Sequence, residues 1–308
     1  MNEGLVVAAF GRHCLVEDAQ GERRICHPRG KKNPVVVGDR VRWQPTGDEG
    51  SIEAVLPRRN LFYRQDDLRT KSFAANLDQV VVLLAADPEF SESQLSRALI
   101  AAQAAGIAVR IVLNKRDVQP AFDRAWARLQ PYRRMGYTVL PLRLQGPDGM
   151  PGDDGLDALL SHLHGQQSLV LGPSGVGKST LVNRLVPHAQ ALTGEISRAL
   201  NAGKHTTTST TWYWMDAAQH TALIDSPGFQ VFGLHHIEPM QLAHLMPDLK
   251  AHVGDCRFYN CTHLHEPGCA VLAHVQPDQA DGDEGAISPM RHHIYRELFA
   301  ELSEKRRY

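Results

Sequence analysis

The chain has 308 residues, which is enough for two or three domains that each bury a core of their own. Its composition, with 43% hydrophobic and 22% charged residues, is ordinary for a globular protein, and a formal net charge of -1 excludes a whole-chain electrostatic attraction to nucleic acid or membrane. Any basic binding surface must therefore be local.

Targeting signals and disulfides are not expected. The N-terminal apolar run, residues 5–10, is short and follows no basic region, and the longest other apolar run, 80–86, cannot span a bilayer. The five cysteines are an odd number, and three of them fall close to histidines, which favours metal ligation over a disulfide framework. We expect a cytoplasmic monomer without membrane contact.

The first part of the chain is rich in short β-type runs, residues 5–10, 24–26, 35–43 and 51–55, which are separated by turns with Gly, Pro and Asp. This pattern predicts a five-stranded OB-fold barrel as domain 1–66. Basic residues crowd one predicted loop and the stretch after it, next to Phe62 and Tyr63: Arg23, Arg24, His27, Arg29, Lys31, Lys32, Arg58, Arg59 and Arg64. Two interpretations stay open, a solvated basic loop and an RNA-binding surface that contacts phosphates and stacks bases.

The middle of the chain alternates buried strands with helical patterns. The strands are expected at 80–86, 108–113, 138–142, 168–171 and 221–224, and the helices at 93–105, 121–132, 156–163 and 178–185. Such alternation is typical of βαβ units with a parallel sheet, so we predict an α/β domain over residues 67–236. Beyond it the chain becomes rich in His and Cys and then helical, which predicts a mainly helical, zinc-binding domain over 237–308.

A phosphate-binding loop follows the strand 168–171. It satisfies G-x-x-x-x-G-K-[ST] between a buried strand and a helical pattern, and it comprises Gly172, Pro173, Ser174, Gly175, Val176, Gly177, Lys178, Ser179 and Thr180. The glycines allow successive N–H groups to face the phosphates. Lys178 is expected to reach the β and γ phosphates and Ser179 to bind Mg²⁺.

A guanine-reading motif ends the strand 108–113. Asn114, Lys115, Arg116 and Asp117 match N-K-x-D, in which Asp117 accepts from the guanine ring N–H and exocyclic amine, Asn114 supports the other edge and Lys115 covers the base. Adenine would leave these polar groups unpaired, so the motif predicts GTP as substrate and GDP as product. The alternative is a P-loop ATPase or kinase in which this match is accidental.

Two further elements complete the expected site. The tetrapeptide Asp-Ser-Pro-Gly from Asp225 to Gly228 resembles the D-x-x-G element. In that element Asp225 would hold Mg²⁺ through water, and the Gly228 N–H would sense the γ-phosphate. The alternative is a simple turn. A Gly- and Thr-rich stretch, 203–210, lies where a Mg²⁺-binding threonine is expected. Thr207 is the first choice there and Thr206 the second.

The motifs occur in an unusual order, because the guanine motif precedes the phosphate-binding loop and D-x-x-G comes last. They can form one site only in a circularly permuted GTPase domain. Phe229 stands where many GTPases carry a water-orienting glutamine, so intrinsic hydrolysis should be slow, and His205 or a group from a partner would orient the water. The rival interpretation is an RNA-binding module whose nucleotide is only structural.

A metal site is expected in the last domain. Cys256, Cys261, His263 and Cys269 offer three thiolates and one imidazole within a short segment, the ligand set of one closed structural Zn²⁺ site. His265 is the competing imidazole.

Taken together, these motifs resemble the ribosome small-subunit-dependent GTPase A (RsgA) family over nearly the full chain. The resemblance rests on the permuted order, Gly-Lys-His-Thr-Thr-Thr, Asp-Ser-Pro-Gly-Phe and the Cys-x4-Cys-x-His-x5-Cys spacing. It implies an OB-fold, a permuted G domain and a zinc domain that act on the small ribosomal subunit in late maturation, with GTP hydrolysis stimulated by the subunit. The basic barrel and the zinc segment then become candidate rRNA contacts. One departure is the loop 143–146, where the family usually has a Ser; it affects a nucleotide contact made largely by backbone.

Overall fold

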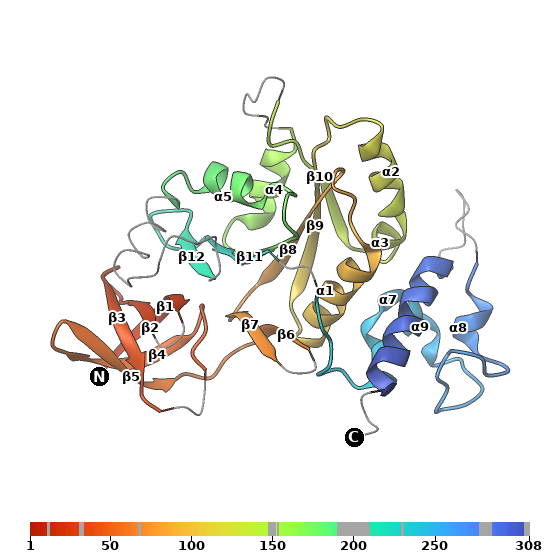
Figure 1. Cartoon of the computed structure of the whole chain (residues 1–308), viewed down its shortest axis with the longest axis horizontal. Coiled ribbons are helices and arrows are strands. Elements are labelled where there is room, and N and C mark those ends of the chain that lie inside the picture. The colour runs from red at the N-terminus through yellow and green to blue at the C-terminus, as the bar shows by residue number, and fades with distance from the viewer. Residues whose placement is uncertain are drawn as a thin grey trace.

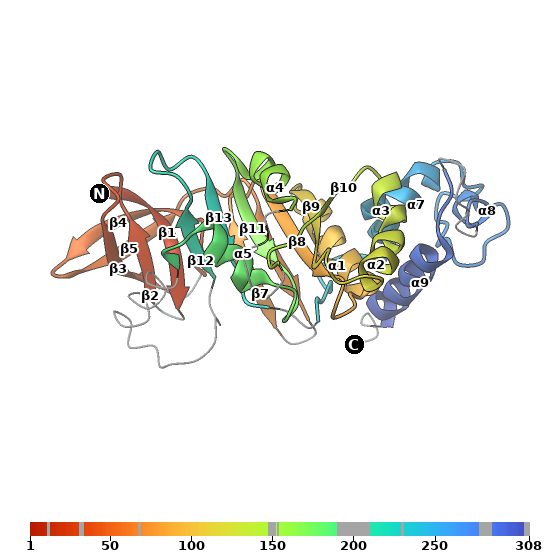
Figure 2. The ribbon, with the colours of Figure 1, turned by 90° about the horizontal axis from the view of Figure 1, so that it is seen from above.

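Three units follow one another along the long axis of the molecule, as the computed structural model shows in two views (Figure 1, Figure 2). A β-barrel lies at one end, an α/β unit in the middle and a helical unit at the other end. The structure describes residues 1–10, 13–30, 34–66, 69–146, 152, 154–189, 210–228, 231–276 and 285–304.

The N-terminal unit is a closed barrel of five strands. They are β1 (Asn2–Phe10), β2 (His13–Glu17), β3 (Arg23–Pro28), β4 (Arg40–Thr46) and β5 (Glu49–Val55), in the order β1-β2-β3-β5-β4 with β1 also pairing β4. The predicted barrel is confirmed, but the strand expected over 35–43 begins only at Arg40. Gly38 adopts φ +88 and the Asp39 carboxylate accepts from the Val36 N–H, so a turn occupies the first half of that run.

A two-stranded hairpin connects the barrel to the next unit. β6 (Leu61–Gln65) pairs antiparallel with β7 (Thr70–Ala75) in a sheet of its own, which was not predicted. Phe62 and Phe73 on this hairpin pack against Phe232, with ring centroids 5.6 and 5.8 Å from that of Phe232. The Gln65 N–H donates to the Gly233 carbonyl and the Gln65 carbonyl accepts from the His235 N–H. The hairpin therefore holds the chain that leaves the Asp-Ser-Pro-Gly element.

The central unit is a mostly parallel sheet with helices on both faces. Its strands are ordered β10-β9-β8-β11-β13-β12, and only β12 runs antiparallel to its neighbour β13. The strands span β8 (Gln79–Ala85), β9 (Ala108–Asn114), β10 (Thr138–Pro141), β11 (Gln167–Leu171), β12 (Thr211–Trp214) and β13 (Ala222–Asp225). The helices span α1 (Glu92–Ala104), α2 (Ala121–Arg128), α3 (Gln130–Arg134), α4 (Leu156–Leu163) and α5 (Lys178–Leu185).

Alternate residues of the fully buried strand β8 face two different cores. Val80 and Val82 pack with α1, α2 and α3, whereas Val81 and Leu83 pack with α4 and α5. This is why the strands are nearly continuous apolar runs. The helix predicted over 121–132 is divided into α2 and α3, since Pro131 in the first turn of α3 lacks the N–H that a continuous helix would need.

The barrel and the central sheet are joined edge to edge. β1 pairs antiparallel with β12 through Ala8 and Thr211, and the Trp214 indole N–H donates to the Glu17 carboxylate at 2.6 Å. Strands of the two units thus form one sheet of eleven strands in the described part of the chain.

The C-terminal unit is helical and packs on α1. It contains η2 (Pro239–Leu245), α7 (Pro247–Val253), α8 (Ala270–Ala273) and α9 (Pro289–Glu304), with α9 beside α7 in Figure 1. Arg291 of α9 is buried and forms a bidentate ion pair with Asp248 of α7, while its third nitrogen donates to Ser96 of α1. Among the described helices, none has the length and apolar character needed to cross a membrane.

Candidate functional site: a nucleotide cavity and a metal cluster

A cavity of about 960 Å³ lies where the carboxyl ends of β9, β11 and β13 meet. Parallel strands bring the loops that follow them to one edge of the sheet, which is where ligands bind in such folds. The cavity is lined by Lys71, Asn114, Lys115, Asp117, Val118, Leu144, Gln145, Pro173, Ser174, Gly175, Gly177, Lys178, Ser179, Thr180, Pro227 and Gly228. Three motifs separated in sequence therefore share one cavity.

Asn114 ties the guanine motif to the phosphate-binding loop. Its side-chain amide donates to the Val176 carbonyl at 2.9 Å and accepts from the Leu144 N–H at 3.3 Å. Gly177 adopts φ +99, and a Cβ there would lie 2.4 Å from the Asn114 amide nitrogen. Only glycine fits this position, because it must accept both the left-handed backbone and the close approach of Asn114.

The cationic and acidic groups of the phosphate end face each other. The Lys178 ammonium lies 3.3 Å from the Asp225 carboxylate, and both side chains are largely buried. Burial raises the pKa of Asp225 and the nearby Lys178 opposes that shift. The Gly228 backbone packs on the phosphate-binding loop, since a Cβ at Gly228 would come within 3.2 Å of Ser174 Oγ. This arrangement has the positive lining and the tight backbone that a bound phosphate chain requires.

Some predicted residues lie elsewhere. Arg116 is absent from the lining of the cavity and forms an ion pair with Asp154 at 3.0 Å. Val176 of the phosphate-binding loop is buried and is also absent from the lining. Gly172 contributes backbone next to Gly228 and is absent from the described lining of the cavity. The predicted residues His205, Thr206 and Thr207, together with Phe229, lie outside the described residues.

Sequence reasoning missed two lining residues, Lys71 and Val118. Val118 directly follows the guanine motif, so its position was a usable signal. Lys71 belongs to no motif and reaches the cavity only because β7 is part of the hairpin. The loop 143–146 after β10, which differs from the usual family pattern, supplies Leu144 and Gln145 to the lining.

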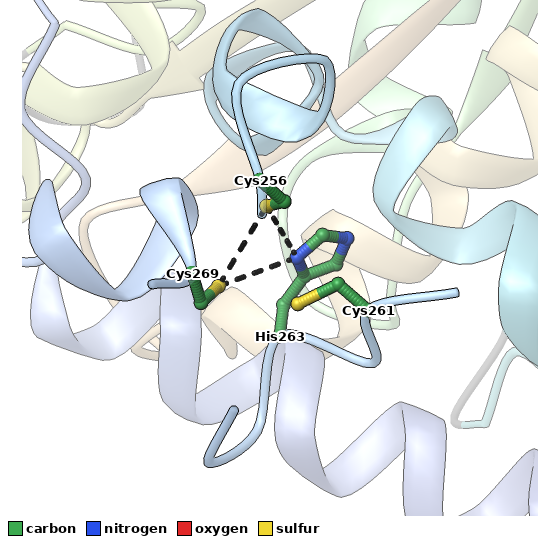
Figure 3. Close-up of side chains that lie close together, drawn as sticks. All are labelled: Cys256, Cys261, His263 and Cys269. Atoms are coloured by element: carbon green, nitrogen blue, oxygen red, sulfur yellow. Dashed lines mark hydrogen bonds between the residues drawn. The ribbon is translucent and has the colours of Figure 1, made fainter. Parts of the chain in front are cut away.

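A second cluster of ligand-type side chains lies in the C-terminal unit (Figure 3). Cys256, Cys261, His263 and Cys269 point toward one another, and their ligand atoms all lie within 4.8 Å. His263 Nδ1 is 3.5 Å from the sulfurs of Cys256 and Cys269, and these two sulfurs are 3.9 Å apart. Tetrahedral Zn²⁺ with bonds of about 2.3 Å to sulfur and about 2.0 Å to nitrogen requires ligand separations of roughly 3.5–3.8 Å. The donor set and the spacing therefore fit zinc.

The neighbourhood of the cluster favours His263 over His265 as the imidazole ligand. Burial lowers the pKa of His263, which keeps the ring neutral as a metal ligand must be. The side chain of His265 is exposed, while its backbone N–H donates to the Glu266 carboxylate at 3.2 Å. Glu266 also accepts from the N–H groups of Thr262 and Leu264, so the loop is shaped around this carboxylate.

Most of the described basic residues of the barrel have acidic partners. Arg29 pairs with Glu53 and Arg58 pairs with the buried Asp39, and the remaining pairs are Arg23 with Glu17, His27 with Glu49 and Arg59 with Asp78. Lys31 and Lys32 lie outside the described residues. Five of the nine residues of the predicted basic set thus contact a carboxylate, which favours a structural role for these five.

Comparison with known proteins assigns the family. Residues 55–235, more than half of the chain, match the family model described as RsgA GTPase. The chain belongs to the RsgA GTPase family. It is therefore a GTPase, a hydrolase that acts on GTP. The part matched by the family model contains the guanine motif, the phosphate-binding loop and the Asp-Ser-Pro-Gly element.

Relatives and solved structures extend the match to the whole chain. A protein of Variovorax paradoxus named "Small ribosomal subunit biogenesis GTPase RsgA" is 65% identical over 306 residues, 99% of this chain and 94% of the relative. A protein of Bordetella pertussis with the same name is 51% identical over 286 residues, 92% and 93% of the two chains.

The structure of YjeQ from Thermotoga maritima matches with a TM-score of 0.70, 29% identity and 98% coverage of both chains. YloQ, described as a circularly permuted GTPase, matches with a TM-score of 0.69 and 26% identity, covering 100% of this chain and 97% of its own. The predicted multidomain fold with a permuted RsgA-type G domain is confirmed.

Proposed function

We propose that this chain hydrolyses GTP in the 960 Å³ cavity and that the small ribosomal subunit stimulates this reaction during late subunit maturation. The observation that carries the proposal is the bond from Asn114 to the Val176 carbonyl, which fixes the guanine-type motif against the phosphate-binding loop in one cavity. The partner is inferred from the relatives, which are named for small ribosomal subunit biogenesis.

The two ends of the cavity would bind different parts of GTP. Asp117 lines the end of the cavity that lies next to the carboxyl end of β9. Its carboxylate would accept hydrogen bonds from two N–H groups of guanine. Lys115 lies beside it with its ammonium on the Asp87 carbonyl, so its stem is held next to the base site. At the other end, Lys178 and the N–H groups of residues 174–179 would hold the phosphates.

Ser179 would hold Mg²⁺ directly and Asp225 would hold it through water. The ion would supply positive charge that neutralises the charge developing on the phosphates. In this structure Lys178 compensates the charge of Asp225 at 3.3 Å. A threonine, Thr207 or else Thr206, would complete the coordination, and His205 or a group of the ribosomal subunit would orient the water.

Zn²⁺ at Cys256, Cys261, His263 and Cys269 would have a structural role. All four ligands come from protein and leave no position for substrate, which is the pattern of closed sites. Four metal bonds would crosslink a loop that has little regular secondary structure.

An RNA contact is best supported next to this zinc loop. Tyr259 is 101% exposed and Phe258 is 40% exposed, and the Arg257 guanidinium lies 5.4 Å from the centroid of the Phe258 ring. Exposed aromatic rings beside a guanidinium are suited to stack on unpaired bases. Among the described residues of the predicted basic set, only Arg24 of the barrel and Arg64 of the hairpin have no ion pair to a carboxylate, so the contribution of the barrel to rRNA binding would be smaller.

The test is GTP hydrolysis by purified protein with and without small ribosomal subunits, with Lys178→Ala as control for contaminating activity. We expect a slow basal rate, a large stimulation by subunits and loss of both in the variant. Equal rates with and without subunits, despite intact GTP binding, would refute the proposed partner. Efficient displacement of bound GDP by ATP would refute the guanine site instead.

A further inference from the structure

The interdomain hairpin places a lysine at the nucleotide cavity. Lys71 is the second residue of β7 and lines the same cavity as Pro227 and Gly228. Every other lining residue lies at the carboxyl end of a strand of the central sheet or in the segment after such a strand, so Lys71 alone among the described lining residues comes from the connection between barrel and G domain.

The position of Lys71 on the hairpin costs free energy. Its cross-strand partner in the register of β6 and β7 is Arg64, and like charges directly opposite each other destabilise an antiparallel pair. The Lys71 side chain is exposed, and its partial desolvation and the neighbouring Arg64 both lower its pKa. No acidic side chain compensates Lys71 within the ranges that the structure describes. An anion in the cavity would relieve this repulsion.

Arg64 shows at which end of the cavity the lysine lies. Its guanidinium donates to the Val231 carbonyl, three residues after Gly228, and its Nε is buried without a described hydrogen-bond partner. Gly228 in turn packs on Ser174 of the phosphate-binding loop. The Arg64 and Lys71 pair therefore approaches from the side of Asp-Ser-Pro-Gly, away from the guanine motif.

We propose that the ammonium of Lys71 contacts the γ-phosphate of GTP, so that a residue outside the G motifs distinguishes GTP from GDP. This proposal rests on GTP binding in the cavity. A terminal phosphate brings charge close to Lys71, whereas GDP ends one phosphate earlier and leaves the lysine without its partner.

The experiment compares dissociation constants for GDP and for a slowly hydrolysed GTP analogue, measured by calorimetry on the full chain. Lys71→Met keeps the apolar stem and removes the charge, and Lys71→Arg keeps the charge. Arg69→Ala removes a cation from the exposed turn of the same hairpin and is the matched control. Thermal unfolding without nucleotide checks that each variant folds.

We expect Lys71→Met to weaken the analogue about tenfold, which corresponds to roughly 1.4 kcal/mol, and to change GDP binding less than about twofold. Lys71→Arg should restore most of the analogue affinity, and Arg69→Ala should change neither constant. Equal losses for GDP and the analogue would overturn the γ-phosphate contact, as would unchanged analogue binding. A parent chain that binds neither nucleotide would instead overturn the proposed function.

Discussion

Replacement of Arg291 should detach the C-terminal unit from the G domain. The Arg291 side chain is 3% exposed, and it spans three elements: Asp248 of α7 at 2.8 and 3.0 Å, Ser96 of α1 at 2.6 Å and the Tyr132 ring of α3 at 5.4 Å. In Arg291→Met the Asp248 carboxylate stays buried without its cation. Breaking one side of a buried ion pair typically costs about 3–5 kcal/mol, so we expect a loss of that size in the free energy of unfolding.

The assay is urea unfolding followed by far-UV circular dichroism, together with limited proteolysis of the native chain. Arg296→Ala removes an exposed arginine from the same helix and should stay within about 0.5 kcal/mol of the parent. The double variant Arg291→Met with Asp248→Leu should recover most of the loss, because no charge then remains buried. A loss below about 1 kcal/mol in Arg291→Met would refute the reasoning.

Three further outcomes are expected. Asp117→Asn should weaken GDP binding by about a hundredfold and favour xanthosine diphosphate, whose carbonyl oxygen at C2 replaces the amino group of guanine and can accept from the new amide; unchanged GDP affinity in calorimetry would argue against Asp117 as the base-reading residue. Cys261→Ser should lower bound zinc, measured by mass spectrometry, from one ion per chain and destabilise the C-terminal unit, whereas full zinc content would exclude Cys261 as ligand. A hydrogen bond from Arg97 lowers the pKa of the partly buried Glu301. The ionised carboxylate therefore contributes to the free energy of unfolding, by at most about 1 kcal/mol after solvent screening. This contribution is present above about pH 5, and it is lost as the pH falls from the pKa of the unfolded chain through the lowered pKa of the folded chain. Glu301→Gln should thus differ from the parent in urea unfolding at pH 7 and converge with it near pH 3, and a constant difference would contradict this linkage.

The central site was predictable because local patterns determine it. Asn114, Lys178 and Asp225 each stand at the end or just beyond the end of an apolar strand, and parallel strands bring such positions to one edge without knowledge of side-chain contacts. The clustering of Cys256, Cys261, His263 and Cys269 was predictable for a similar reason, since they lie within one short segment of the chain.

The hairpin and its lysine were not predictable in this way. The position of Lys71 depends on pairing of Gln65 with Gly233 and His235, which lie more than 160 residues further along the chain. No local pattern specifies such a contact. The split between α2 and α3 was also not predicted, because the apolar periodicity continues across it; Pro131 is the residue that marks the break.

The edge pairing of β1 with β12 has a mechanical consequence when it is considered with the hairpin. β12 begins at Thr211, four residues after Thr207, and pairs with β1 of the barrel. The chain that follows Gly228 leads to the helical unit at the other end of the molecule. Each outer unit is thus connected to one segment expected to sense the γ-phosphate: the barrel to the segment that contains Thr207, and the helical unit to the Asp-Ser-Pro-Gly element. A large rigid partner that bound the barrel and the helical unit at a fixed distance from each other would favour one nucleotide over the other without touching the cavity. By reciprocity, exchange of that nucleotide would weaken binding of the partner by the same free energy.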